Sequence, residues 1–183
     1  ITRPVLNVII PIDEPVSGEK IDSGSKILFK SFGLTYLNAE PKEVKLNSQV
    51  AMTIVNDRVT QIQSDRAIMN FTRNKLNFFM DEQKSFDRQF VLVHQQTLEM
   101  KSRILDVDLR ASKIQTISAI NDVSIRDRTF SSTSGKAIFI EKTNQIQLSE
   151  FPQVYQEGDT ITGDLIIYND GLNVITRDPN DSA

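Results

Sequence analysis

Few side chains in this sequence have the types and spacing that catalysis or metal binding needs. The one histidine, His94, has no second histidine and no cysteine to work with, so neither a zinc site nor a histidine-activated nucleophile is predicted. Asp106 and Asp108 would share one face of a strand and could bind a cation, although a solvated sheet edge is the simpler explanation. Gly158 and Gly163 lack the spacing of a phosphate-binding loop. We therefore expect no enzyme, no metal and no cofactor.

The composition narrows the class of protein further. The chain has 183 residues, 39% of them apolar, which is enough for one domain or two small ones. No run of 18 apolar residues is present, and a net charge of −3 argues against a nucleic-acid partner. The absence of cysteine does not fix the compartment. Because the chain begins with Ile1 rather than methionine, we expect that a signal peptide or an inner-membrane anchor has been removed.

The elements that must position any functional surface are strands. Apolar and polar residues alternate over residues 50–54, 138–140, 146–148 and 161–167, and a period of two places successive side chains on opposite faces of a sheet. Turn-forming residues separate such runs about every ten residues, which suits a sandwich or a barrel. No segment has a helical stripe, and residues 79–89 are expected to form a loop or a short turn. The sequence predicts an almost wholly β protein.

The domain boundaries follow from the prolines and the polar ends. Pro4, Pro11 and Pro15 interrupt regular pairing because proline donates no backbone hydrogen bond. Residues 1–30 are therefore expected to form an extended arm or an edge strand. Residues 31–177 are expected to form a single domain, followed by a polar tail over residues 178–183.

A weak internal repeat is visible at an offset of 70 residues. Residues 67–70 align with residues 137–140, and Ser64 then aligns with Ser134. Each copy contains small polar residues, an apolar strand, an asparagine-containing turn and a second apolar strand. The pattern indicates either stacked repeats that share one interior or the self-similarity of any meandering β protein.

The last 60 residues resemble a known family. Residues 121–125 read Asn-Asp-Val-Ser-Ile and residues 135–137 read Gly-Lys-Ala, as in two steps of the OstA-like domain of lipopolysaccharide-transport proteins, the LptA/LptC type. The third matching run consists of Pro152, Val154, Ile161, Gly163, Asp164, Ile166 and Tyr168. One departure is that Glu150-Phe151 replaces a glycine-containing turn, so that corner is expected to change slightly.

The resemblance implies a fold and a function. The fold is an all-β jellyroll in which two antiparallel sheets form a V-shaped groove open at both ends. The function is that of a periplasmic, non-catalytic protein that binds lipopolysaccharide by its acyl chains and passes it along a bridge between the inner and outer membranes. The partners are other jellyroll domains, joined by edge-strand pairing, with a homo-oligomer as one form of that assembly.

Strand parity together with this resemblance predicts which residues line the groove. They are Val123, Ile125, Ile138, Ile140, Ile146, Leu148, Val154, Ile161, Leu165, Ile167 and Val174. A second interpretation stays open, because a closed core needs the same apolar rows. In that case the chain is a β-sandwich or β-solenoid scaffold. A polysaccharide-active enzyme would require a paired-carboxylate cleft, for which the sequence offers no support.

Overall fold

The computed structural model describes residues 5–9, 15–22, 25–37, 42–80, 90–169 and 173–177, with side chains for all of these except 5–9, 22, 37 and 173–177. Well over half of the chain is in strands, and the helical structure of the described residues is the 3-10 turn η1 (Glu141–Thr143). The prediction of an almost wholly β protein is confirmed. Within the described ranges no helix is long and apolar enough to cross a membrane. The loop expected at 79–89 lies mostly outside the described residues.

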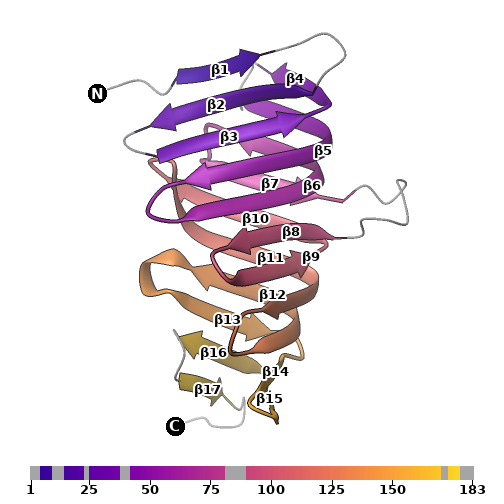
Figure 1. Ribbon diagram of the computed structural model, residues 1–183, viewed down its shortest axis with the longest axis vertical. Coiled ribbons are helices and arrows are strands. Elements are labelled where there is room, and N and C mark those ends of the chain that lie inside the picture. The colour runs from indigo at the N-terminus through magenta and orange to yellow at the C-terminus, as the bar shows by residue number, and fades with distance from the viewer. Residues whose placement is uncertain are drawn as a thin grey trace.

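In the described residues seventeen strands lie across the long axis of the molecule, with the N-terminus at one end and the C-terminus at the other (Figure 1). The strands are β1 (Val5–Ile9), β2 (Val16–Asp22), β3 (Ser25–Ser31), β4 (Gly33–Leu37), β5 (Glu43–Val55), β6 (Val59–Asn70), β7 (Lys75–Phe79), β8 (Val91–Gln95), β9 (Leu98–Ser102), β10 (Ile104–Arg110), β11 (Lys113–Arg126), β12 (Ser131–Ile140), β13 (Gln145–Ser149), β14 (Gln153–Gln156), β15 (Asp159–Thr162), β16 (Leu165–Asn169) and β17 (Asn173–Arg177).

The strands form one antiparallel sheet that is folded over on itself into two layers. One layer runs β1-β2-β3-β5-β6-β8-β9-β11-β12-β14-β15, and we call it the β1–β15 sheet. The other runs β4-β5-β6-β7-β10-β11-β12-β13-β16-β17, and we call it the β4–β17 sheet. Strands β5, β6, β11 and β12 belong to both layers, because each pairs with different neighbours over its two halves.

These four long strands bend at what we call the fold line, which runs along one side of the molecule. In β5 the pairing register shifts between Asn47 and Val50, and in β11 it shifts between Ile120 and Val123. The residues in between include the left-handed pair Asn121 and Asp122, with φ of 64° and 52°. Such bulges turn a strand sharply, so the two halves of one strand can join different layers.

A serine lies at every second bend along the fold line. The hydroxyls of Ser31, Ser64, Ser102 and Ser134 each donate to the backbone carbonyl two residues further on, at 2.8 to 3.0 Å. Each hydroxyl thereby hydrogen-bonds to a backbone carbonyl that, because of the bend, does not bond to a neighbouring strand. The serines recur every 32 to 38 residues, so the 70-residue offset seen in the sequence spans two structural repeats.

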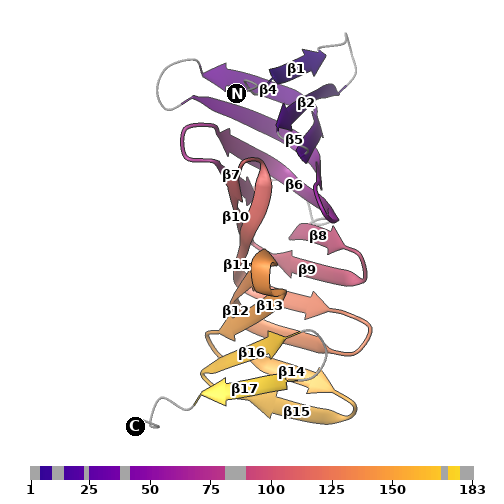
Figure 2. The same cartoon turned by 90° about the vertical axis from the view of Figure 1, so that its left-hand side faces the viewer.

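The described hairpin turns of both layers lie on the opposite edge, which we call the turn side. Figure 2 shows the same stack from an adjacent direction. Two of these turns, at Ala111-Ser112 and Glu157-Gly158, have positive φ at both central residues, the geometry of the tight hairpin turns that match strand twist. Along the fold line the two layers are joined because the long strands pass from one layer to the other. Along the turn side they are joined by contacts between side chains.

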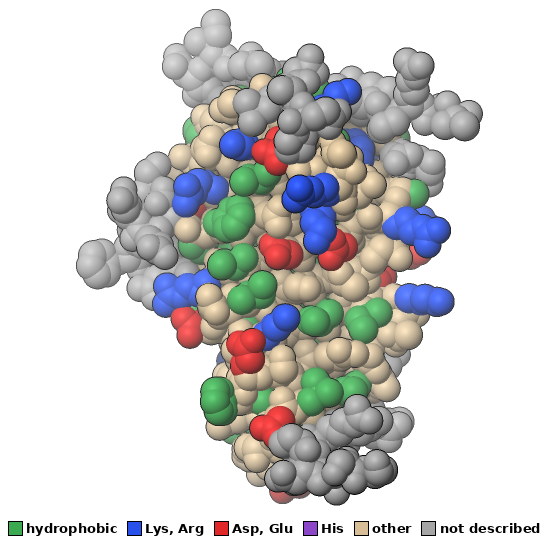
Figure 3. Space-filling model, turned by 180° about the vertical axis from the view of Figure 1, so that it is seen from behind, with side chains coloured by type: hydrophobic (Ala, Val, Ile, Leu, Met, Phe, Trp, Pro, Cys, Tyr) green, Lys and Arg blue, Asp and Glu red, His purple; other side chains and the backbone are tan. Residues whose placement is uncertain are grey.

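The sheet begins earlier in the chain than residue 31. Strands β2 and β3 pair with each other, β3 pairs with β5, and Ile27 and Phe29 lie in the core. Strand β1 pairs with β2 at the N-terminal edge. On the face opposite to that of Figure 1, charged side chains of both signs lie among scattered apolar ones, and no deep groove is visible there (Figure 3).

Candidate functional site: the interior between the two layers

The space between the two layers is an unbroken apolar interior. One cluster of buried side chains extends from Ile27 on β3 to Tyr168 on β16 and includes residues from most of the strands between them. These side chains alternate along each strand with half-buried or exposed ones, as expected when one face of each layer is covered. Most side chains of this cluster are 3% exposed or less, so solvent does not reach them in this conformation.

Five of the eleven predicted lining residues lie fully in this interior. Val123 and Ile125 on β11, Ile146 and Leu148 on β13, and Val154 on β14 are all buried. Ile161 lies on β15, an end strand of its layer, where it is partly buried and packs against the same cluster. The side chain of Val174 lies outside the described part of the chain. Whether any of these residues contacts lipid stays a prediction.

The orientation of four other predicted lining residues is wrong. Ile138 and Ile140 on β12, and Leu165 and Ile167 on β16, are only half-buried. These four side chains point to the outer face of the β4–β17 sheet. The residues between and beside them point inward instead, namely Ala137, Phe139, Ile166 and Tyr168.

The pairing register explains this error. Residues directly opposite each other on neighbouring strands share a face of the sheet. Phe139 is opposite Ile146, and Ile138 is opposite Gln147. Ile138 and Ile146 therefore cannot both face the interior. The sequences of β12 and β16 are apolar on both faces, so parity within one strand gave no information about which face was covered.

Polar contacts join the two layers along the turn side. Arg58, at the β5–β6 turn, donates from Nη1 to Asn144 Oδ1 at 2.6 Å, and its Nε lies 3.8 Å from Glu141 Oε1. Gln95, at the end of β8, donates to Glu141 Oε2 at 3.4 Å and to Thr60 Oγ1 at 3.1 Å. The contacts with Glu141 and Asn144 connect the β1–β15 sheet with η1 and the turn after it in the β4–β17 sheet, whereas the contact of Gln95 with Thr60 lies within the β1–β15 sheet.

Three further contacts extend this connection towards both ends of the molecule. Lys113, at the β10–β11 turn, lies 3.7 Å from Asp57. Nearer the C-terminal end, the hydroxyls of Thr129 and Tyr168 are 3.2 Å apart, and the rings of Phe130 and Tyr168 pack with centroids 4.1 Å apart. We call all of these turn-side contacts, including those of Arg58 and Gln95, the lateral seam. Sequence analysis did not predict it, because its members are far apart in the chain.

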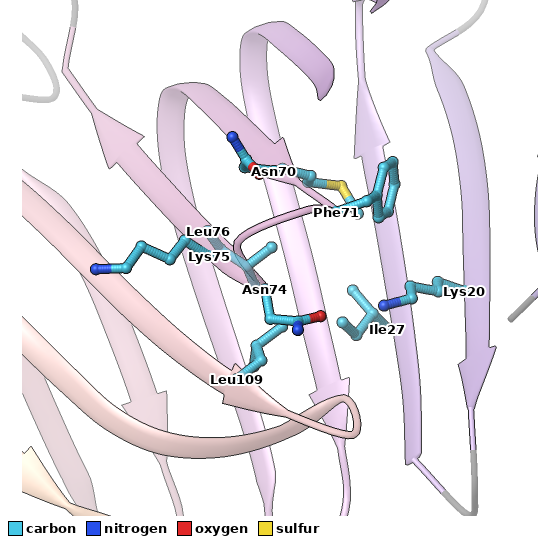
Figure 4. A pocket seen from close by; sticks show the side chains of 9 residues that line it. Lys20, Ile27, Asn70, Phe71, Asn74, Lys75, Leu76 and Leu109 are labelled. Atoms are coloured by element: carbon cyan, nitrogen blue, oxygen red, sulfur yellow. The ribbon is translucent and has the colours of Figure 1, made fainter. Parts of the chain in front are cut away.

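A small hollow lies where the turn side approaches the N-terminal end. It is lined by Lys20, Ile27, Met69, Asn70, Phe71, Asn74, Lys75, Leu76 and Leu109. Figure 4 shows Lys20, on β2, facing the turn that carries Phe71 and Asn74 across this hollow. The free space is close to 10 Å³, about what one water molecule occupies. The hollow therefore cannot hold an alkyl chain unless a side chain moves.

The candidate chemical groups of the sequence occupy ordinary surface positions. His94 is partly exposed and lies 4.0 Å from Glu99. Asp106 accepts a hydrogen bond from Asn77 at 2.8 Å, and Asp108 is 3.0 Å from Lys75. In the described ranges no group of three or more histidine, aspartate or glutamate side chains converges as a metal site would require. Both aspartates thus have protein partners in place of a cation.

The fold and its interior define a class: an all-β jellyroll made of one sheet folded around an apolar interior. Comparison with known structures is consistent with this class. The chain matches the crystal structure of LptH from Pseudomonas aeruginosa, described as the LptA-homologous periplasmic component of the lipopolysaccharide transport device. The match has a TM-score of 0.57 and 14% sequence identity, and it covers 67% of this chain and 85% of LptH.

Comparison by sequence identifies the family. Residues 60–172 match the family described as LptA/(LptD N-terminal domain) LPS transport protein. Comparison with curated proteins gave no match. Because the family match spans more than half of the chain, the chain belongs to this family of OstA-like lipopolysaccharide-transport domains.

Proposed function

We propose that this chain is a periplasmic, non-catalytic protein that binds lipopolysaccharide by its acyl chains and passes it to the next protein of a transport bridge. The observation that carries the proposal is the apolar interior, which runs without interruption from β3 to β16 in a member of this family. Each CH₂ group moved from water into such an interior gains about 0.8 kcal/mol. A few acyl chains would therefore bind without any polar recognition.

Both ends of the folded sheet support a role in a chain of domains. At the N-terminal end β1 and β4 each pair on one side, and at the C-terminal end β15 and β17 do the same within the described residues. An end strand offers unpaired backbone donors and acceptors to a compatible strand of another molecule. Pairing at both ends would extend the two layers, and the interior between them, into the partner.

Binding requires the interior to open, because its side chains are closed off from solvent. Phe139 is 3% exposed and Leu148 is 0% exposed, so acyl chains can enter only if the layers separate or such side chains rearrange. The fold line joins the layers covalently, whereas the lateral seam consists of side-chain contacts. Separation of the layers along the turn side is therefore the route with the lower energetic cost.

A second function is favoured by the same packing. A buried interior and a bridged turn side are also the properties of a scaffold with a closed core, which assembles through its end strands and binds no lipid. The two functions differ in what contacts the interior residues in cells.

Site-specific photo-crosslinking tests the proposal against the scaffold. A benzophenone amino acid would replace Phe139, whose side chain points inward, and, as the matched control, Ile138, its outward-pointing neighbour on β12. We expect lipopolysaccharide adducts from position 139 and few or none from position 138. Because the probe is bulky, Ile166 and Ile167 on β16 provide a second inward and outward pair.

The scaffold is favoured if adducts are absent from both inward positions while the variants remain folded and periplasmic. Equal labelling from inward and outward positions would indicate adsorption of lipid to the surface, and it would also contradict the proposal.

A further inference from the structure

The side chain of Ser132 places an unbonded hydroxyl in the apolar interior. Ser132, on β12, is 2% exposed, and its Oγ has no hydrogen-bond partner in the described part of the chain. It is directly opposite Ile125 on β11 and Val154 on β14, both of which are buried. Because residues opposite each other share a face of the sheet, the Ser132 hydroxyl faces the interior between two aliphatic side chains.

Most of the other buried hydroxyls in the described residues have a partner. Ser134, two residues further along β12, donates to the Lys136 carbonyl at 3.0 Å, as the other serines of the fold line do to theirs. Ser25, in the β2–β3 hairpin next to residues outside the described ranges, is the second unbonded case. Buried polar atoms are normally bonded, and an unbonded one is destabilising. The Ser132 hydroxyl therefore lowers the stability of this conformation.

A small apolar side chain at position 132 would avoid that loss of stability. Ala119 on β11 and Ala137 on β12 occupy inward positions of the same two strands and are fully buried, so alanine is compatible with the packing there. Groups that destabilise the unliganded protein are characteristic of functional sites, where stability is given up for binding. The position of Ser132 thus indicates a hydroxyl that is bonded when a ligand occupies the interior.

Ser132 lies close to the turn side, where separation of the layers would admit acyl chains. It follows Phe130 by two residues, and the Phe130 ring packs against Tyr168 of the other layer with centroids 4.1 Å apart. The hydroxyls of Thr129 and Tyr168, 3.2 Å apart, belong to the same part of the lateral seam. A chain that passes the two rings leaves its polar head in water at the rim. The oxygen that reaches Ser132 is then one carried by the chain itself, a few carbon atoms from the head.

We propose, on the basis of the function proposed above, that Ser132 makes the interior selective for acyl chains that carry a hydroxyl group near their head. The serine hydroxyl both donates and accepts, so it can bond to a chain hydroxyl in either direction. A plain chain leaves the Ser132 oxygen unbonded, as in the unliganded protein. A site that bonds to a ligand hydroxyl rejects the analogue that lacks it, because its own polar group then stays buried without a partner.

Calorimetric titration with three probes of equal chain length tests this selectivity. The probes are 3-hydroxydodecanoate, dodecanoate and 12-hydroxydodecanoate, which carries its hydroxyl at the far end of the chain. We expect the parent protein to bind 3-hydroxydodecanoate roughly fivefold more tightly than dodecanoate, as one additional hydrogen bond supplies. The 12-hydroxy probe should bind no more tightly than dodecanoate. Ser132→Ala should abolish the preference for 3-hydroxydodecanoate.

Ser134→Ala is the matched control, because it removes a neighbouring buried hydroxyl that already has a partner. It should keep the preference and lower the thermal unfolding temperature of the unliganded protein. Ser132→Ala should leave that temperature unchanged or raise it, because it removes an unbonded polar atom. In methyl NMR spectra of the parent protein, 3-hydroxydodecanoate should shift the signals of Ile125 and Val154 at lower concentration than that of Ile27, which lies near the other end of the interior.

Three results would each overturn the role of Ser132. They are failure of all three probes to bind, the same preference in the parent protein and in Ser132→Ala, and a lower unfolding temperature in Ser132→Ala, which would indicate an ordinary structural hydrogen bond to water. If any of these occurs while position 139 still crosslinks to lipopolysaccharide, only the selectivity is lost. If the preference is as expected but no inward position crosslinks, transport is lost and a site for hydroxylated acyl chains remains.

Discussion

Gly135 lies directly against Glu150 across the fold line. The Gly135 amide donates to the Glu150 carbonyl at 2.8 Å, and a Cβ atom on residue 135 would lie 2.6 Å from the Glu150 Cβ and 2.5 Å from Oε2. Glu150 and Phe151 both have positive φ, 63° and 59°, although neither is glycine. The Glu150-Phe151 corner, which departs from the family pattern, thus fits because the facing residue on β12, Gly135, has no side chain.

The first prediction concerns this contact. Gly135→Ala should lower the free energy of unfolding by about 1 to 3 kcal/mol, because a new methyl group overlaps a neighbouring side chain and backbone. Glu150→Gly should be neutral or stabilising by itself, because it relieves the left-handed conformation of a non-glycine residue. In the double variant most of the loss should disappear, as measured by urea denaturation. An undiminished loss in the double variant would mean that Glu150 is not the obstacle.

The second prediction tests the orientation of β12. Phe139→Ala should destabilise the protein by about 3 to 5 kcal/mol, as expected when a large buried side chain leaves a cavity. Ile138→Ala, on the outer face of the same strand, should cost about 1 kcal/mol or less. Urea denaturation of both variants gives the comparison. Equal costs would show that β12 is covered on both faces.

The third prediction concerns the lateral seam. Glu141→Gln should lower the unfolding free energy by about 1 kcal/mol, because Arg58 and Glu141 are mostly buried and joined to the same network. Asp108→Asn is the control: its ion pair with Lys75 lies within one layer and is exposed, and its loss should be near zero. A double-mutant cycle with Arg58→Met should show coupling at low salt. Zero coupling would mean that the seam does not hold the layers together.

The fourth prediction concerns the pH dependence of Glu99 on β9. The hydrogen bond from Lys101, with a smaller contribution from its charge, holds the pKa of Glu99 below the ordinary value of 4.5. Because the pKa is lowered by folding, this stabilisation is present above pH 4.5 and is lost as the pH falls through the folded-state pKa. Carboxyl NMR titration should give a normal pKa for Glu99 in Lys101→Met. An unchanged pKa would assign the effect to another neighbour.

The fifth prediction concerns assembly through β17. Val174→Pro should abolish concentration-dependent association and transfer to a partner, because proline removes a backbone donor from a terminal strand that pairs only with β16 in the described structure. Val174→Thr keeps the donor and nearly the same shape, and it should associate like the parent. Light scattering measures the size and circular dichroism checks the fold. Equal assembly of the proline variant would place the junction elsewhere.

The sequence was sufficient to predict the class of fold and to predict which side chains face the interior on some of the strands. On β13 the polar residues Gln145 and Gln147 alternate with Ile146 and Leu148, so the buried face was unambiguous. On β12 and β16 both faces are apolar, and only the pairing register decides which one is covered. That register depends on neighbouring strands, which a pattern within one strand does not contain.

Contacts across the turn side could not be predicted for a related reason. Arg58 and Glu141 are 83 residues apart, and they meet because the β5–β6 turn of one layer lies next to η1 of the other. The bend at Ser48 and Gln49 has positive φ without any glycine, so it too lacks a local signal, whereas Asn121-Asp122 has residue types that tolerate this conformation.

Because the fold line is regular, the length of the molecule depends on the number of its repeats. Each repeat between successive serines adds two strands to each layer, which lengthens the stack by about 10 Å at a spacing of about 4.8 Å per strand. The cross-section is unchanged, because each strand contacts mainly its immediate neighbours. A duplication or deletion of one such unit would therefore change how far a single copy extends, so the length of an assembly joined through its end strands would depend on repeat number as well as on the number of molecules.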